Sequence, residues 1–399
     1  MKGKRRTTLA VLVALAMAAM LTLGGAASAQ DQNPRDQNTL SSLADGSSTS
    51  AAAVEPSEGS SPFKVVAKGL NNPRGLALGP KGTLYVTEAG KGGVGPCGTG
   101  AEGGEVCYGK SGALTRVKDG VQRRVIKGLP SFAGEGGVAA EGPSDVSVRG
   151  KPGSLRLFVT VGGFVAESGG ARDISGDNRF QTLLRAKGDE LKRVADLLAY
   201  EKKHNPDGQQ IDSDPYSLVT SKKERVVADA GANDLLKVEG GDISTLAVFP
   251  DRRVEGPGGE TVPMEAVPDA VAKAPGRGYY VGELTGFPFP VGGARVYHVV
   301  AGSKKVHAKG FTNIIDVAVG PKGGLYVLEI AKKGLLQAFS PGGDFTGELI
   351  HISPNGKRKV VASEGLVAPT SVAVGPKGAL YVSNFGIFPH QGEVVRIQP

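Results

Sequence analysis

The chain of 399 residues contains the stretch GLNNPRGLALGPKGTLYVTEAG at residues 69–90, and this stretch recurs twice. The copies are GFTNIIDVAVGPKGGLYVLEIA at 310–331 and GLVAPTSVAVGPKGALYVSNFG at 365–386. Each copy has a short apolar strand, a Gly-Pro-Lys-Gly turn and a second strand built on Leu-Tyr-Val. Proline fixes φ in the turn and glycine accepts a positive φ, so a tight hairpin is favoured. Self-similarity of this kind indicates a repeat architecture.

Three looser copies of the template lie between the first stretch and the second. The six repeats begin near Pro73, Pro143, Pro215, Pro268, Ile314 and Pro369. Successive starts are 70, 72, 53, 46 and 55 residues apart, whereas a four-stranded propeller blade takes about 40–50 residues. The sequence therefore predicts an all-β, six-bladed β-propeller over residues 63–399. The first two blades are expected to carry insertions, near 91–111 and 164–212.

The two ends of this domain are expected to share a sheet. The sixth repeat stops at Pro399, directly after its third strand at 392–397. The segment FKVVAKGL at 63–70 resembles the fourth-strand segment RKVVASEGL at 358–366. The N-terminal strand is therefore predicted to complete the last blade, because closure hides a sheet edge that would otherwise invite aggregation. The alternative of two separate domains would leave both end strands unpaired.

The first 62 residues have a different composition from the repeats. Residues 1–29 combine a basic start, an apolar run and an Ala-Ser-Ala site, which is typical of a secretory signal peptide. A membrane anchor is the alternative, although the run is short and rich in alanine. Residues 30–62 are polar and lack apolar periodicity, which predicts a disordered spacer. The protein is thus predicted to be secreted, without a membrane span once the signal is removed.

Charge and cysteine content restrict the classes of partner. The formal net charge is +8, but the signal peptide supplies four basic residues and the remaining basic side chains are dispersed. The sequence therefore does not indicate nucleic-acid binding. Cys97 and Cys107, the only cysteines, are predicted to form a disulfide within the first insertion. A metal site at these cysteines is the alternative, but no histidine lies near them in the sequence.

Two sets of equivalent positions are candidates for the central channel. The first set, at the start of each innermost strand, is a candidate ligand-binding ring: Arg74, Asp145, Tyr216, Asp269, Asp316 and Ser371. The second set ends each second strand, and its polar members are Glu88, Asp229, Glu283, Glu329 and Asn384. If their oxygens converge, they suit Ca²⁺. The alternative is a structural role, in which each side chain bonds turn amides. No other cofactor is predicted.

The second insertion contains a helical pattern followed by an acidic loop. Leu191, Val194, Leu198 and Glu201 have helical spacing, which predicts a helix over 189–201. Asp207, Asp212 and Asp214 follow in a loop that resembles a calcium-binding loop only loosely, because it lacks the standard spacing and the terminal glutamate.

Several short motifs together resemble the ScyD/ScyE family of exported propellers, named after genes in the scytonemin biosynthesis cluster. They are GLNNPRGLA at 69–77, GPC at 95–97, NPDG at 205–208, ADAGANDLL at 228–236 and VSNFG at 382–386. The likeness covers nearly the whole chain from Phe63, and more broadly the repeats resemble NHL-type six-bladed propellers. The resemblance implies an exported propeller but supplies no catalytic residues.

Two functions remain open at the level of the sequence. The first is a monomeric binding or scaffold protein whose face meets a small molecule, an extracellular protein or a polysaccharide. The alternative is a metal-dependent hydrolase or lyase related to gluconolactonase-type or virginiamycin-B-lyase-type propellers. The chain has acids for such a site but no distinctive general base, and it lacks the H-E-x-x-H and G-x-S-x-G motifs. No catalytic residue is therefore predicted.

Overall fold

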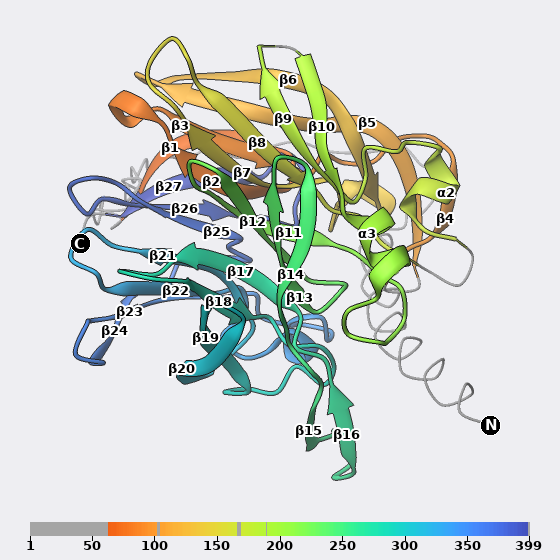
Figure 1. Cartoon of the computed structure of the whole chain (residues 1–399), viewed down its shortest axis with the longest axis vertical. Coiled ribbons are helices and arrows are strands. Elements are labelled where there is room, and N and C mark those ends of the chain that lie inside the picture. The colour runs from red at the N-terminus through yellow and green to blue at the C-terminus, as the bar shows by residue number, and fades with distance from the viewer. Residues whose placement is uncertain (1–62, 102–103, 166–168, 189, 398–399) are drawn as a thin grey trace, which may run out of the picture.

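The computed structural model describes residues 63–101, 104–165, 169–188 and 190–397. The predicted signal peptide and spacer, residues 1–62, lie outside these residues. The described chain is all-β, and six antiparallel sheets radiate from a common axis (Figure 1), five of them four-stranded and the first five-stranded because of the added β4. The predicted six-bladed β-propeller is confirmed.

Each blade is a meander whose first strand lies at the axis and whose last strand lies at the rim. Blade one consists of β2 (Pro73–Leu78), β3 (Leu84–Glu88), β5 (Glu105–Lys118) and β6 (Val121–Ala133). Blade two consists of β7 (Pro143–Arg149), β8 (Arg156–Val161), β9 (Thr182–Lys187) and β10 (Glu190–Asp196). Blade three consists of β11 (Pro215–Thr220), β12 (Glu224–Asp229), β13 (Asp234–Glu239) and β14 (Asp242–Val248).

The remaining blades follow the same plan. Blade four consists of β17 (Pro268–Lys273), β18 (Tyr279–Glu283), β19 (Ala294–Val300) and β20 (Ser303–Phe311). Blade five consists of β21 (Ile314–Val319), β22 (Leu325–Glu329), β23 (Glu348–Ile352) and β24 (Arg358–Ala362). Blade six consists of β25 (Ser371–Val374), β26 (Leu380–Asn384), β27 (Gly392–Ile397) and β1 (Phe63–Leu70).

Blade six joins the two ends of the domain, as the sequence predicts. Strand β1 pairs antiparallel with β27, so that Phe63 lies opposite Ile397 and Val65 opposite Val395. Figure 1 shows the orange β1 beside the blue β27. The ring is therefore closed by hydrogen bonds between strands that are far apart in the sequence, and blade six leaves neither of its terminal strands unpaired.

The Gly-Pro-Lys-Gly turn forms the tight connection between the first two strands of a blade. In blade one it is a short 3₁₀ turn, Pro80–Gly82, in which Lys81 has a φ of 59° and Gly82 a φ of 72°. The amide of Gly79 donates to the carbonyl of Thr83 at 2.7 Å. Glycine adopts such a φ without steric cost, which explains its place after the lysine.

The hydrophobic core lies between adjacent blades. Leu114 and Ile126 of blade one pack in one cluster with Val146 and Val159 of blade two. Corresponding clusters join blades four and five, and blades six and one. Because alternate residues of a strand point to opposite faces of its sheet, a blade with neighbours on both sides buries both faces.

Short elements decorate the blades. Strand β4 (Cys97–Thr99) pairs with the extended β5, and the predicted disulfide between Cys97 and Cys107 is confirmed. The hairpin of β15 (Arg252–Glu255) and β16 (Thr261–Met264) projects from the ring (Figure 1). The helices are α2 (Ala171–Ser175), α3 (Leu197–His204) and α4 (Leu335–Ala338). Among the described residues, no helix has the length and apolar character needed to cross a membrane.

The helix predicted over 189–201 is wrong for most of its length. Residues 190–196 form β10, and the helix α3 begins only at Leu197. The pairing of β10 with β9 shifts between Arg193 and Ala195. Such a bulge interrupts the alternation of side chains between the two faces of a strand. The apolar residues Leu191 and Val194 are therefore three positions apart, which imitates the period of a helix. The region expected to be an insertion, 164–212, thus also supplies two blade strands.

Candidate ligand site on the propeller axis

The axial channel is built from two layers of side chains. In each blade the inner two strands share one equivalent pair, three residues after the start of the repeat, for example Leu76 opposite Val86 and Val146 opposite Val159. The residues two positions before these pairs form the upper layer: Arg74, Ser144, Tyr216, Asp269, Ile315 and Thr370. The residues one position before them form the lower layer: Gly75, Asp145, Ser217, Ala270, Asp316 and Ser371.

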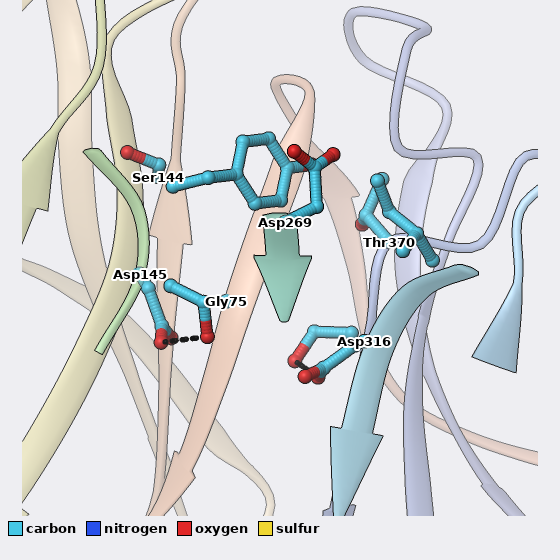
Figure 2. A pocket seen from close by; sticks show the side chains of 10 residues that line it. Gly75, Ser144, Asp145, Asp269, Asp316 and Thr370 are labelled. Atoms are coloured by element: carbon cyan, nitrogen blue, oxygen red, sulfur yellow. Dashed lines mark hydrogen bonds between the residues drawn. The ribbon is translucent and has the colours of Figure 1, made fainter. Parts of the chain in front are cut away.

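The six residues predicted as a single ring therefore belong to two layers. Arg74, Tyr216 and Asp269 are in the upper layer, whereas Asp145, Asp316 and Ser371 are in the lower layer. The equivalence assumed from the sequence was wrong because three of the residues follow the start of their repeat by one position and the other three follow it by two positions. Figure 2 shows the arrangement, with Ser144 and Asp269 above Asp145 and Asp316.

The lower layer connects neighbouring blades by hydrogen bonds. Asp316 of blade five accepts from the Val372 amide at 2.8 Å and from the Ser371 hydroxyl at 2.7 Å, both in blade six. Asp145 of blade two likewise accepts from the Leu218 amide of blade three at 2.7 Å. Burial raises the pKa of Asp316 to about 6 although these bonds favour its carboxylate form. These acids have a structural role between blades.

The upper layer is less completely bonded. Arg74 donates to the carbonyls of Ala140 at 2.7 Å and Gly386 at 3.2 Å, and within the described residues it forms no ion pair. Asp269 is 3% exposed, and its Oδ1 has no hydrogen-bond partner. Burial and, secondarily, the charge of Asp214 raise the pKa of Asp269 well above its usual value, while Arg74 opposes this shift.

Two further acids from the segment before β11 surround this layer. Burial and the charge of Asp229 raise the pKa of Asp214 to about 7, and Arg74 again opposes the shift. Burial and the charge of Asp214 raise the pKa of Asp212 to about 8. Burial also raises the pKa of Tyr216. At neutral pH the upper layer thus combines a fixed cation with groups able to donate or accept a proton.

The channel itself is narrow. The cavity between the two layers measures about 10 Å³, which is room for roughly one water molecule. Its lining consists of Gly75, Ser144, Asp145, Tyr216, Ser217, Asp269, Ile315, Asp316, Thr370 and Ser371 (Figure 2). A larger ligand therefore does not fit between the two layers. The end of the channel on the side of the upper layer, to which Arg74 and Asp269 belong, is called the mouth below.

The second predicted ring lies within the blades. Glu88 accepts from the Asn71 amide and pairs with Arg124 at 2.6 Å. The other members also have partners close to them in the fold: Asp229 with the Asp214 amide, Glu283 with Arg252, Glu329 with the Thr312 amide, and Asn384 with the Val367 amide. Val161, its sixth position, is apolar. These contacts match the structural alternative stated from the sequence.

The described residues do not bring either predicted ring together as a ready metal centre. Among the residues that the structure describes, one set of three His, Cys, Asp or Glu side chains has ligand atoms within 4.8 Å of one another: Cys97, Glu105 and Cys107. Its two cysteines are joined in the disulfide and so are not thiolate ligands. A metal bound by Glu88, Glu283, Glu329 and Asn384 therefore remains a prediction without geometric support.

A second cavity lies away from the axis, between blades four and five. It measures about 560 Å³ and reaches from the turn at Lys322 to the turn before Arg358. Tyr280 and His307, whose ring centroids are 4.5 Å apart, form part of its wall together with Lys309. The wall is basic and open to solvent, and its basic residues are Lys309, Lys322, His307 and Arg358. Among the described residues, however, none that lines this cavity is a buried polar group without a hydrogen-bond partner, as Asp269 is in the channel.

Comparisons with known proteins find similar solved structures but no matching sequence family. No protein-family model and no curated protein matches the chain. A glucose dehydrogenase structure has 15% identity and a TM-score of 0.46, covering 84% of this chain and 99% of its own. Regucalcin, a calcium-binding protein from Agrobacterium tumefaciens strain C58, has 11% identity and a TM-score of 0.45, covering 84% and 92%.

A chain of a nidogen/laminin complex is also similar, with 12% identity and a TM-score of 0.42, covering 70% of this chain and 85% of its own. The similar structures thus include an enzyme and a binding complex. At these identities the likeness concerns the fold alone. The resemblance to the ScyD/ScyE family stays a prediction.

The sequence pointed to Arg74, Tyr216 and Asp269 but not to the role of Asp214 beside them. Asp214 precedes the proline that starts β11, and its carboxylate accepts from the Gly163 amide at 3.1 Å in blade two. A polar residue directly before a strand-initiating proline was a usable signal, because that position lies at the same end of the channel as the upper layer.

Proposed function

We propose that the mouth of the axial channel binds a small, hydroxyl-rich molecule that carries a carboxylate or phosphate group. Arg74 is the anchor for the anionic group, because guanidinium binds such groups through paired hydrogen bonds. Asp269 and Tyr216 bind the hydroxyl groups. The observation that carries the proposal is the state of the two charged residues: Arg74 has no ion-pair partner, and buried Asp269 keeps an unbonded oxygen.

The two carbonyl bonds of Arg74 support this role. They hold the guanidinium in place without neutralising its charge, so a ligand meets a cation that is already oriented. In the sequence Arg74 stood out as the one basic residue among the ring positions. Export from the cell, predicted from residues 1–29, remains part of this proposal, and the ligand is then an extracellular one.

The test is calorimetry of the purified chain with gluconate, glucuronate and a sugar phosphate. We expect at least one of them to bind, and Arg74→Met to weaken that binding about 10- to 100-fold, as the loss of a charge-assisted hydrogen-bonded pair implies. Arg123→Met on the exposed part of β6 is the matched control. Absence of binding to all three, or equal binding by R74M, would refute the proposal.

A second candidate is a hydrolase or lyase that uses acid–base chemistry at the same mouth. Asp214, with a pKa of about 7, and Asp269, with a raised pKa, lie in one electrostatic group with Arg74. A group with a pKa near neutrality suits proton transfer, and a neighbouring cation stabilises a developing oxyanion. The pair takes the place of the metal that the sequence-based alternative required.

This candidate is tested by turnover of sugar lactones and of uronate-containing substrates. We expect Asp214→Asn and Asp269→Asn each to lower kcat/KM by about 10²-fold or more, while Asp242→Asn on the rim has no effect. If the chain binds the acids above but turns over none of these substrates, the binding function stands alone.

A further inference from the structure

A second group of acids lies off the axis, where α3 meets the β12–β13 hairpin. Glu201 is on the buried face of α3, next to Leu197 and Leu198, and is 1% exposed. Asp234 begins β13 and is 0% exposed. The four oxygens of these two carboxylates have no hydrogen-bond partner among the residues that the structure describes. Buried acids are normally bonded or paired, so both side chains are unusual.

The surroundings of the two acids add further oxygens. Asn205 ends α3 in a left-handed conformation, with a φ of 38°, and its Oδ1 is also buried without a partner. Asp207 follows in the loop, where its Oδ2 accepts from the Asn233 side chain at 3.4 Å. This bond brings the loop to the turn directly before Asp234.

The charges in this group have one sign. The charges of Asp229, Glu201 and Asp207 raise the pKa of Asp234, after burial as the largest cause. No arginine or lysine is among the residues that act on Asp234 or on Glu201. The bonds of Asp229 are directed elsewhere, to the Ser213 hydroxyl and the Asp214 amide. The fold therefore concentrates negative charge at a buried place without a compensating cation from the described chain.

We infer that Glu201, Asn205, Asp207 and Asp234 form a binding site for Ca²⁺. The donor set consists of carboxylate and amide oxygens, which a hard divalent cation prefers, and Ca²⁺ accepts six to eight such ligands in flexible geometry. Three separate segments supply them: the end of α3, the loop after it and the start of β13. Water molecules complete the shell, because the four residues do not supply every ligand.

The three acids do not converge on one point in the structure. No three of the described carboxylates here have oxygens within 4.8 Å of one another. Like charges repel in a medium of low dielectric constant, and the ion removes that repulsion when it binds. Glu201 has rotatable side-chain bonds and Asp207 lies in a loop, so these two side chains are the ones that close on the ion.

The site has a consequence for the axis, although it does not depend on the function proposed there. The segment from Asn205 leads directly to Asp212 and Asp214 beside the channel mouth. An ion held by Asn205 and Asp207 fixes the beginning of that segment to blade three. The bound cation is therefore a structural one, and it lies on the side of the mouth that blade three forms.

Calorimetry with Ca²⁺ alone, on the purified full chain in chelator-treated buffer, tests the inference. We expect one ion per chain, and an affinity about tenfold or more lower for Glu201→Gln and for Asp234→Asn. Asp242→Asn, an exposed acid on β14 of the same blade, is the matched control and should bind as the unchanged chain does. Asp269→Asn should also bind normally, which separates this site from the channel.

Thermal unfolding gives a second readout, because D234N should be at least as stable as the unchanged chain in chelator and less stable than it in Ca²⁺. In chelator, D234N should melt at or above the temperature of the unchanged chain, because it removes a buried charge. In Ca²⁺, the unchanged chain should gain several degrees and D234N should not, since only bound ligand stabilises the fold. If D234N fails to fold, E201Q on α3 provides the same comparison. No heat with Ca²⁺, equal binding by both variants, or equal affinity for Mg²⁺ would each overturn the assignment.

Discussion

The two layers of the axial channel use the same residue type in different ways. Asp269 in the upper layer is buried and Asp316 in the lower layer is partly buried, and both have a raised pKa. Asp316 accepts hydrogen bonds from Ser371, Val372 and Val317. Asp269 keeps an oxygen without a partner, in a layer that contains Arg74. The two acids thus differ in hydrogen-bond satisfaction, and the less satisfied one, Asp269, is also the more buried one.

This comparison separates structural acids from candidate functional ones. A buried carboxylate that accepts hydrogen bonds from the amides of the next blade stabilises the closed ring, because these bonds offset the free-energy cost of removing the carboxylate from water. A buried carboxylate without such bonds costs free energy. Strain and unsatisfied groups tend to be retained where a ligand compensates them. The same criterion selects Glu201 on α3 and Asp234 on blade three.

The largest expected effect is the loss of a lower-layer acid. Asp316→Ala should lower the free energy of unfolding by about 2–4 kcal/mol, because it leaves the Val372 amide and the Ser371 hydroxyl without their acceptor. Denaturant titration followed by far-UV circular dichroism measures the change. A loss below roughly 0.5 kcal/mol, typical of surface substitutions, would remove the distinction between the layers.

The second expected effect is a dependence of stability on pH. The pKa of Asp316 is about 6 in the folded chain, above the value near 3.9 of an unfolded aspartate. Between these values the folded state binds more protons at this group, so the contribution of Asp316 to stability is fully present below about pH 4 and is lost as pH rises through 6. The slope is about 1.4 kcal/mol per pH unit for one such group.

Thermal unfolding between pH 4 and 8 measures this dependence. Asp316→Asn should remove the part of the slope between pH 4 and 6, whereas Asp212→Asn should flatten the curve up to pH 8, in line with its pKa of about 8. Identical slopes for the unchanged chain and both variants would show that these carboxyls titrate as they do when unfolded.

The smallest expected effect is at the upper layer. Asp269→Asn should change the free energy of unfolding by about 1 kcal/mol or less, and in the stabilising direction, because the substitution removes a buried carboxyl with an unbonded oxygen. The same denaturant titration measures it. A loss as large as that of D316A would mean that Asp269 has a structural partner, and the ligand site would lose its main acid.

The sequence predicted most of the fold and less of the site. The copies of GPKG and Leu-Tyr-Val indicated the hairpins, and the likeness of 63–70 to 358–366 indicated the pairing of β1 with β27. The helix expected over 189–201 failed because a bulge near Val194 shifted the spacing of apolar residues. Local periodicity cannot distinguish a bulged strand from a helix over so few residues.

The sequence alone determined the repeat, the number of blades, the closure of the ring and the disulfide. These features depend on turn residues and on strand patterns, which act locally along the chain. Only the tertiary structure decided which acids are satisfied. Asp269, Asp316 and Asp234 look alike in the sequence, but the neighbouring blade offers an amide donor to Asp316. Within the described residues, the two oxygens of Asp234 and the Oδ1 atom of Asp269 have no donor. Hydrogen-bond partners between blades come from residues about 50 or more positions away, and a linear pattern does not contain that information.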